Sequence, residues 1–110
     1  MTKPLIALDW GTTRARAFLI GDGIGVLDRR SADQGIQSVP EGGFPAAFEA
    51  IAGDFRRSRP DAAIVLAGMV GSRNGWVEAP SVPCPAPPDA VASAAMPVTL
   101  ADGATALILP

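Results

Sequence analysis

The chain has 110 residues, of which 48% are hydrophobic and 18% charged, so it can form one domain with a modest core and is too apolar for a disordered segment. A formal net charge of −2 gives no general attraction to nucleic acid. No apolar run approaches the roughly 20 residues that span a bilayer, and residues 1–4 lack a secretory signal pattern. We therefore expect a cytoplasmic protein that meets small molecules, without membrane or nucleic-acid partners.

The sequence contains one cysteine and no histidine. An internal disulfide is therefore excluded, and zinc or Ser-His-Asp chemistry is disfavoured. Cys84 is flanked by prolines and has no activating neighbour in the sequence, so we expect it to be inert.

The first thirty residues predict a meander of three strands. Residues 4–9 form an unbroken apolar run that ends in a carboxylate, as in a strand buried on both faces. Residues 14–20 alternate and predict an antiparallel return strand, with a hairpin around residues 10–13. A turn at Gly21-Asp22-Gly23 then leads into a third strand over residues 24–29.

Residues 35–43 predict a loop, and the helix that follows is the clearest in the sequence. Its apolar positions have the spacing of one helix face, and they are Phe44, Ala47, Phe48, Ile51, Ala52 and Phe55. Residues 60–61 end the helix, and residues 62–67 form a second apolar strand that stops at Gly68. A strand-helix-strand crossover places the two apolar strands in parallel, so residues 9–11 and 68–71 should emerge side by side, where open α/β sheets bind ligands.

The last third of the chain is rich in proline and alanine. Residues 80–88 predict an ordered surface connection, and residues 89–96 a short helical turn. Residues 98–100 and 105–109 predict a hairpin with an Asp-Gly turn. Because a strand runs up to the last residue, we expect a chain cut inside a larger protein.

The first hairpin turn carries the residues of an anion site. Gly11 allows phosphate oxygens to approach the backbone, Thr12 and Thr13 supply hydroxyls, and Asp9 can hold Mg²⁺ directly or through water. The alternative is a plain hairpin turn in which Asp9 bonds backbone amides. The pattern alone leaves both interpretations open.

Two segments resemble known kinases. Asp9-Trp-Gly-Thr-Thr13, with Arg14, Arg16 and the apolar residues after them, resembles the first phosphate motif of sugar kinases in the actin, hexokinase and Hsp70 superfamily. Residues 67–80, AGMVGSRNGWVEAP, with Val82-Pro83-Cys84-Pro85, resemble the corresponding segment of the 2-keto-3-deoxygalactonokinases.

The resemblance implies an α/β fold of the ribonuclease H-like, actin-like ATPase type, with this chain as the N-terminal lobe or part of it. It implies ATP-dependent phosphorylation of the 6-hydroxyl of 2-dehydro-3-deoxy-D-galactonate. Asp9 would be the catalytic and Mg²⁺-associated carboxylate, and Gly11, Thr12 and Thr13 would contact the ATP phosphates. Arg14 could also neutralise phosphate charge, or it could flank the turn in solvent.

The second segment suggests a wall for the sugar acid. Ser72 and Asn74 can bond hydroxyls, and the fork of Arg73 suits a carboxylate. Trp76 is predicted to belong to the same sugar wall, with packing over the sheet as its alternative. Glu78 could bond a hydroxyl or pair with an arginine.

The resemblance also implies a partner absent from this chain, the C-terminal lobe that carries the adenosine pocket; it allows an oligomer. We therefore expect the isolated chain to be inactive. Two other classes stay open: a stand-alone module that binds a sugar acid or a protein without catalysis, and an actin-like or chaperone-type ATPase lobe. The clusters Arg29-Arg30 and Arg56-Arg57-Arg59 are expected to be solvated faces.

Overall fold

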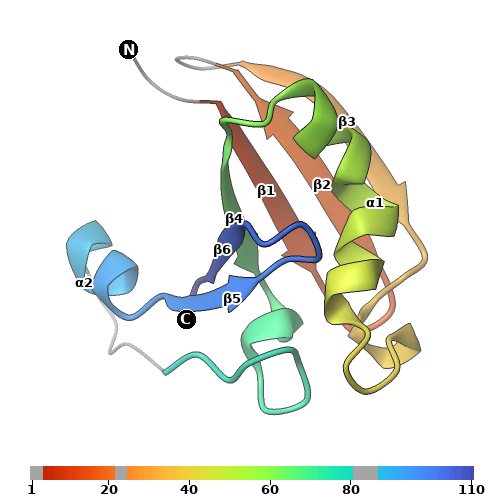
Figure 1. Ribbon diagram of the computed structural model, residues 1–110. Helices are drawn as coiled ribbons and strands as arrows, with labels where there is room; N and C mark the ends of the chain where they lie inside the picture. The colour runs from red at the N-terminus through yellow and green to blue at the C-terminus, as the bar shows by residue number, and fades with distance from the viewer. Residues whose placement is uncertain (1–3, 22–24, 81–86) are drawn as a thin grey trace.

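One mixed α/β sheet organises the chain, and the computed structural model describes it over residues 4–21, 25–80 and 87–110. The described strands are β1 (Leu5–Trp10), β2 (Ala15–Ile20), β3 (Val26–Ala32), β4 (Ala63–Ala67), β5 (Met96–Thr99) and β6 (Thr105–Ile108). The described helices are α1 (Phe44–Ser58) and α2 (Pro88–Ser93), with short 3-10 turns η1 (Ile36–Ser38) and η2 (Met69–Gly71). The strands of this region lie in the order β3-β2-β1-β4-β6-β5 (Figure 1).

The predicted meander and crossover are confirmed. β1 and β2 are antiparallel, as are β2 and β3, while β1 and β4 are parallel from the pair Leu5–Ala63 to the pair Asp9–Ala67. The predicted terminal hairpin also forms, with β5 and β6 antiparallel. Because β6 pairs in parallel with β4, this hairpin extends the same sheet.

The third strand lies later than predicted, since it runs to Ala32 and pairs there with Ala15. Its polar residues are compatible with a strand because β3 is at the edge of the sheet, where most of its side chains meet solvent.

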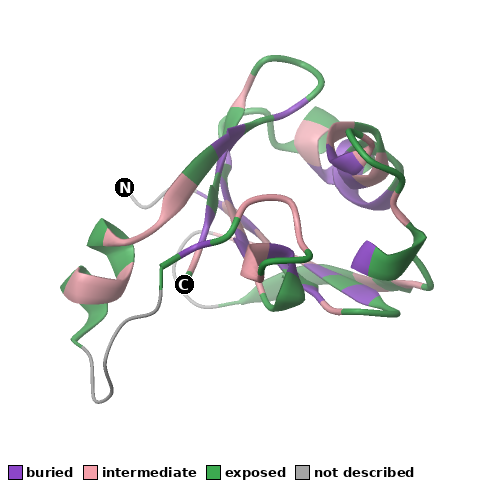
Figure 2. Ribbon diagram, turned by 90° about the horizontal axis from the view of Figure 1, so that it is seen from below, coloured by how far each residue is buried: buried purple, intermediate pink, exposed green. Residues whose placement is uncertain are grey.

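Helix α1 covers one face of the sheet and lies in front of β2 in Figure 1. It begins at Phe44 with Pro45 in its first turn, where a missing backbone N–H costs nothing. Its buried residues repeat every three or four positions, and they are Phe44, Phe48, Ile51, Ala52, Gly53 and Phe55. Figure 2 shows these buried positions on the side of α1 that faces the sheet. The core therefore lies between α1 and this face.

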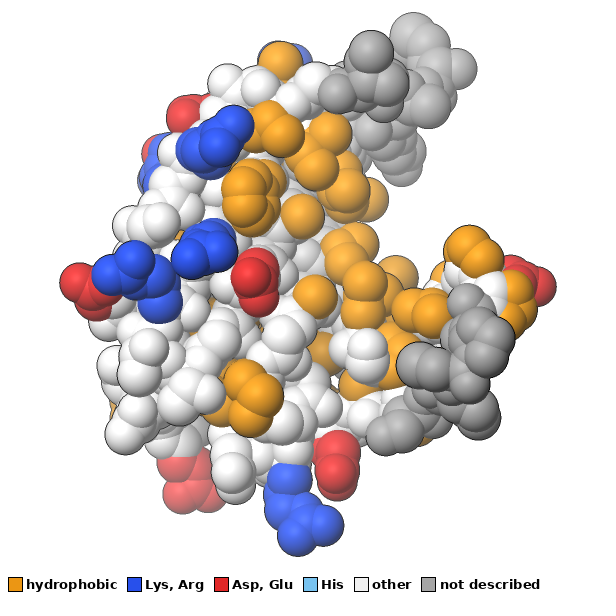
Figure 3. Space-filling model, turned by 180° about the vertical axis from the view of Figure 1, so that it is seen from behind, with side chains coloured by type: hydrophobic (Ala, Val, Ile, Leu, Met, Phe, Trp, Pro, Cys, Tyr) orange, Lys and Arg blue, Asp and Glu red, His pale blue; other side chains and the backbone are white. Residues whose placement is uncertain are grey.

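The prediction that β1 is buried on both faces is wrong. Ile6, Leu8 and Trp10 are buried, whereas Leu5 and Ala7 are half-buried and Asp9 is exposed. Alternate residues of a strand face opposite sides of the sheet, and α1 packs on one side only. On the other side, hydrophobic side chains remain in view over a hollowed surface (Figure 3).

Both arginine clusters were predicted to be solvated, but one arginine of each cluster makes contacts that join elements of the fold. The Arg30 guanidinium lies 4.1 Å from the ring centroid of Phe55 and donates to Asp54 at 2.6 Å. Arg56 donates to the Pro60 carbonyl at 2.9 Å and to Asp102 at 3.1 Å. Both arginines tie other elements to α1, and long aliphatic stems let them do so while partly buried.

Several sequence predictions fall outside the described residues: the turn at residues 22–23, most of the proline-rich connection, and the state of Cys84. Within the described part of the chain, neither helix combines the length and apolar character that crossing a membrane requires.

Candidate functional site

The turn between β1 and β2 forms a small open hollow at the carboxyl end of β1. The Gly11 N–H donates to the Arg14 carbonyl at 2.9 Å and closes the turn, with Thr12 and Thr13 exposed at its tip. The hollow has a volume of about 210 Å³ and is lined by Asp9, Gly11, Thr12, Thr13, Arg14 and Arg16.

The segment around η1 fixes the shape of this turn. The Ile36 N–H donates to the Gly11 carbonyl at 2.9 Å, and the Gln37 N–H donates to the Thr12 carbonyl at 3.0 Å. Gly35 lies so close that a Cβ on it would collide with the Thr12 carbonyl and the Thr13 nitrogen. The carbonyls of Gly11 and Thr12 are thus occupied.

Unlike these carbonyls, the backbone N–H groups at the tip of the turn are unpaired in the part of the chain that the structure describes. Among the residues that the structure describes, the backbone N–H groups of Thr12 and Thr13 have no hydrogen-bond partner. Successive unpaired N–H groups in a turn form a concavity suited to an anion. Together with the two threonine hydroxyls, they can bind phosphate oxygens.

Asp9 borders the same hollow from the end of β1, and Gly68 lies directly beside it. Gly68 has φ +95°, and a Cβ on it would lie 3.0 Å from Asp9 Oδ1 and 3.0 Å from the Trp10 carbonyl oxygen. The predicted meeting of residues 9–11 with the segment after β4 is therefore confirmed. Within the described ranges, the Asp9 carboxylate accepts no hydrogen bond and forms no ion pair, so it does not cap backbone amides in a plain hairpin turn.

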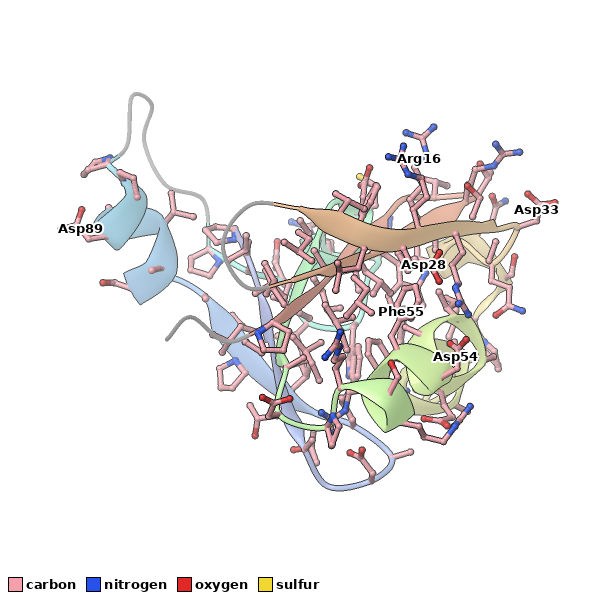
Figure 4. The ribbon with its side chains drawn as sticks, turned by 90° about the horizontal axis from the view of Figure 1, so that it is seen from above. Arg16, Asp28, Asp33, Asp54, Phe55 and Asp89 are labelled. Atoms are coloured by element: carbon pink, nitrogen blue, oxygen red, sulfur yellow. The ribbon has the colours of Figure 1, made fainter. Side chains whose placement is uncertain are left out.

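Sequence reasoning missed Arg16, which pairs with Asp9 in the antiparallel register of β1 and β2. Cross-strand partners share a face of the sheet, so the Arg16 side chain projects from the same face as Asp9. Figure 4 shows Arg16 on the opposite side of the sheet from Asp54 and Phe55 of α1. The alternation Ala15-Arg16-Ala17, counted back through the turn, is the signal that could have found it.

Arg14 lines the hollow too, but from its outer side. Its guanidinium lies 3.4 Å from Asp33, and both side chains are largely exposed. An exposed ion pair of this kind is weak, so Asp33 leaves Arg14 free to exchange partners.

A second, larger hollow opens between the segment that enters α1 and residues 74–76. Its volume is about 470 Å³, and its lining consists of Ile36, Val39, Pro40, Glu41, Gly42, Phe44, Pro45, Asn74, Gly75 and Trp76. The Trp76 ring stacks on Phe44 with centroids 5.6 Å apart and planes at 13°. Phe44 in turn contacts Trp10 edge to face at 5.5 Å, and Trp10 Nε1 donates to the Gln34 carbonyl at 2.8 Å.

Of the four residues predicted to form the sugar wall, two line a hollow and two do not. Asn74 and Trp76 line the second hollow, whereas Ser72 and Arg73 lie outside the linings of both hollows. Ser72 Oγ donates to the Met69 carbonyl at 2.6 Å. Glu78 is exposed and pairs with no arginine of the described ranges.

The residues at the turn suit Mg²⁺ bound together with phosphates. Asp9 offers an exposed carboxylate without a protein partner in the described residues, and these residues form no cluster of three or more metal-ligating side chains. Mg²⁺ in phosphate-transfer sites keeps several waters and uses one or two carboxylates plus the phosphates themselves. One free carboxylate beside a turn with two unpaired backbone N–H groups fits that mode.

The fold and this edge define a mixed α/β protein in which, over the described residues, a turn with two unpaired backbone N–H groups lies at the carboxyl ends of two parallel central strands. Residues 9–110 match the family model for 2-keto-3-deoxy-galactonokinase. The chain belongs to this family.

The relatives agree with that assignment. The chain is 40% identical over 87 residues to 2-dehydro-3-deoxygalactonokinase of Escherichia coli (strain K12), covering 78% of this chain and 28% of that protein. It is 33% identical over 82 residues to a Rhizobium meliloti (strain 1021) protein provisionally given the same name, with 73% and 26% covered.

A crystal structure from Sinorhizobium meliloti, provisionally assigned as a 2-dehydro-3-deoxygalactonokinase, superposes with a TM-score of 0.79 at 29% identity. That comparison covers 96% of this chain and 34% of the other. The chain therefore spans about a quarter to a third of the length of the proteins it matches.

Proposed function

We propose that the complete gene product is an ATP-dependent sugar-acid kinase that phosphorylates the 6-hydroxyl of 2-dehydro-3-deoxy-D-galactonate. Family membership over residues 9–110 supports the substrate class. The observation that carries the assignment is the turn itself, whose Thr12 and Thr13 N–H groups are unpaired in the described structure beside the free carboxylate of Asp9.

In this proposal the turn positions the transferring phosphates of ATP. Thr12 and Thr13 donate backbone and hydroxyl hydrogen bonds to phosphate oxygens, and Gly11 lets them approach closely. Asp9 holds Mg²⁺, which neutralises phosphate charge when it is bound. Arg16 and, farther out, Arg14 add positive charge on the same side.

The sugar acid would occupy the neighbouring segment after β4. Asn74 and Trp76 face the larger hollow, while Ser72 and Arg73 flank it in sequence. Arg73 is exposed, and its fork can pair with the substrate carboxylate at the rim.

We also propose that the chain is the N-terminal lobe, or part of it, of a ribonuclease H-like, actin-like kinase. The three-strand meander followed by a crossover helix and a parallel central strand supports this. A second lobe would supply the adenosine pocket, so the 110-residue chain alone would not catalyse phosphorylation of the sugar acid.

The test is a coupled assay of ADP release by the complete gene product with ATP, Mg²⁺ and 2-dehydro-3-deoxygalactonate. Asp9→Asn keeps the shape of the side chain and removes its charge, so we expect kcat to fall at least about 100-fold with the fold intact by circular dichroism. Asp61→Asn, at an exposed position before β4, is the matched control. Near-normal turnover of Asp9→Asn would overturn the assignment, and ADP release independent of sugar acid would favour an ATPase.

A further inference from the structure

A third hollow lies over strands β2 and β3, on the side of the sheet from which Arg16 projects away from α1 (Figure 4). This β2–β3 hollow has a volume of about 360 Å³ and is lined by Arg16, Phe18, Arg29, Arg30 and Ser31. Arg16 also lines the small hollow at the β1–β2 turn. The two hollows therefore share one residue and one face of the sheet.

The strand register brings two arginines together on this face. Arg16 pairs across the strands with Ser31, and Phe18 pairs with Arg29. Alternate residues of a strand share a face, so Arg16 and Arg29 are diagonal neighbours, at positions from which long side chains reach the same small ligand. Figure 3, seen from behind α1, shows Lys and Arg side chains gathered beside the hydrophobic area of this face.

The fold provides these two arginines with no paired carboxylate. Within the described ranges, neither Arg16 nor Arg29 forms an ion pair or donates a side-chain hydrogen bond. Arg30 differs, because its guanidinium donates to Asp54. Asp9 pairs in register with Arg16 but lines the turn hollow, not the β2–β3 hollow. Two like charges around one volume repel each other, and an anion between them removes that repulsion.

We propose that the β2–β3 hollow is a second anion site, which binds a phosphate group and competes with ATP for Arg16. The guanidinium forks of Arg16 and Arg29 each match two phosphate oxygens, and the Ser31 hydroxyl is a further donor. A phosphate held there engages the arginine that stands beside the ATP phosphates at the turn, so it weakens ATP binding. The anion site itself does not depend on the proposed function, whereas the competition with ATP rests on it.

The size and the lining of the hollow suit a phosphorylated small molecule as well as free phosphate. A volume of about 360 Å³ lies in the range of small-molecule sites and leaves room beside a phosphate group. Phe18 is half-buried at the hollow and offers an apolar surface to the organic part of such a molecule. Both sources share the phosphate group, and the test separates them.

The test uses inorganic phosphate and glycerol 3-phosphate as probes of the complete gene product. Calorimetric titration measures the binding of each probe without ATP, and kinetics measure its inhibition against ATP. Chloride at equal ionic strength controls for screening. The variants are Arg29→Ala, Arg29→Lys and the matched control Arg59→Ala. Arg59 is an exposed arginine that lines a different hollow with Pro4, at the start of β1.

We expect both probes to raise the apparent KM for ATP in the wild type. Arg29→Ala should weaken probe binding and inhibition at least about 5-fold, because it removes a charge-assisted hydrogen-bond donor. Its KM for ATP without a probe should change less than about twofold, since Arg29 does not line the turn hollow. Arg29→Lys should lie between, because it keeps the charge and loses the fork. Arg59→Ala should behave as the wild type.

The relative affinities identify the source of the phosphate group. Tighter binding of glycerol 3-phosphate would support the site with a phosphorylated metabolite as its ligand, and tighter binding of inorganic phosphate would support it with the free ion. Unchanged probe binding in Arg29→Ala would overturn the inference, because the probes would then bind at the turn alone.

The substrate site is a rival explanation for Arg29. A raised KM for the sugar acid in Arg29→Ala, with unchanged inhibition by the probes, would assign the hollow to the substrate and overturn the inference while leaving the proposed function intact. Absence of sugar-acid phosphorylation in the wild type would contradict the proposed function. Calorimetric binding that is lost in Arg29→Ala would support the anion site even then.

Discussion

Arg14 and Arg16 are two residues apart, yet their surroundings differ. Arg16 is the cross-strand partner of Asp9 and has no ion pair within the described residues. Arg14 lies on the outer side of the hollow beside Asp33. In the proposed complex, Arg16 is therefore the cation that stands closer to the metal and phosphates, and Arg14 contributes less.

This difference predicts unequal effects of two otherwise matched variants. Arg16→Ala should weaken binding of Mg²⁺-ATP by roughly 10-fold or more, because it removes a charge-assisted hydrogen bond. Arg14→Ala should weaken it by less than about threefold, since an exposed, solvated arginine contributes little. Calorimetric titration of both variants measures the difference, and equal losses would contradict the ranking.

The sequence predicted that Asp9 and Gly11 would lie close to Gly68. A carboxylate and a glycine at the ends of two apolar runs predict a shared sheet edge, and Gly68 does approach Asp9. The unpaired N–H groups of Thr12 and Thr13 could not be predicted, because they depend on η1 bonding the carbonyls of the turn from more than twenty residues away.

Between elements, two arginines join the sheet to α1. Arg30 links the edge strand β3 to Phe55 and Asp54, and Arg56 links the C-terminal turn of α1 to Asp102 in the loop between β5 and β6. The Asp102 carboxylate also accepts the Ala104 N–H at 2.9 Å. These contacts attach both outer parts of the sheet to the helix.

The Asp102 contacts predict a specific pH dependence. The Ala104 N–H and then the Arg56 guanidinium lower the pKa of Asp102 below its ordinary value. A carboxyl whose pKa is lower in the folded state contributes stability above its unfolded pKa and loses it as the pH falls through the folded pKa. The free energy of unfolding should therefore decrease on acidification partly through Asp102.

Asp102→Asn keeps an acceptor for Ala104 but cannot titrate. We expect its free energy of unfolding in urea to fall less than that of the wild type between about pH 5 and about pH 2. Asp61→Asn, whose carboxylate makes no ion pair in the described ranges, controls for the loss of one negative charge. A wild-type acid dependence in Asp102→Asn would show that this loop contact does not contribute.

Most elements could be predicted because their patterns are local. The spacing of Phe44, Phe48, Ile51 and Phe55 specifies α1, and Asp102-Gly103 specifies the last hairpin, where Gly103 has φ +89°. Two features could not be predicted from the neighbouring sequence alone. The burial of β1 depends on which faces of the sheet are covered, and the structural role of Arg30 depends on Phe55 reaching it from another element.

For the whole molecule, the sheet brings three separate segments to one edge. The β1–β2 turn lines one hollow, and the η1 segment and the segment after β4 line a second, larger one. The chain spans 28% of the length of the Escherichia coli relative.

The central claim is that the turn of residues 9–16 binds the phosphates of ATP. Amide hydrogen exchange of the complete gene product, with and without a non-hydrolysable ATP analogue and Mg²⁺, tests it most directly. We predict strong added protection in the peptide that contains Thr12 and Thr13, less in Asp9→Asn, and none in α2. Added protection elsewhere, with residues 9–16 unchanged, would contradict the claim.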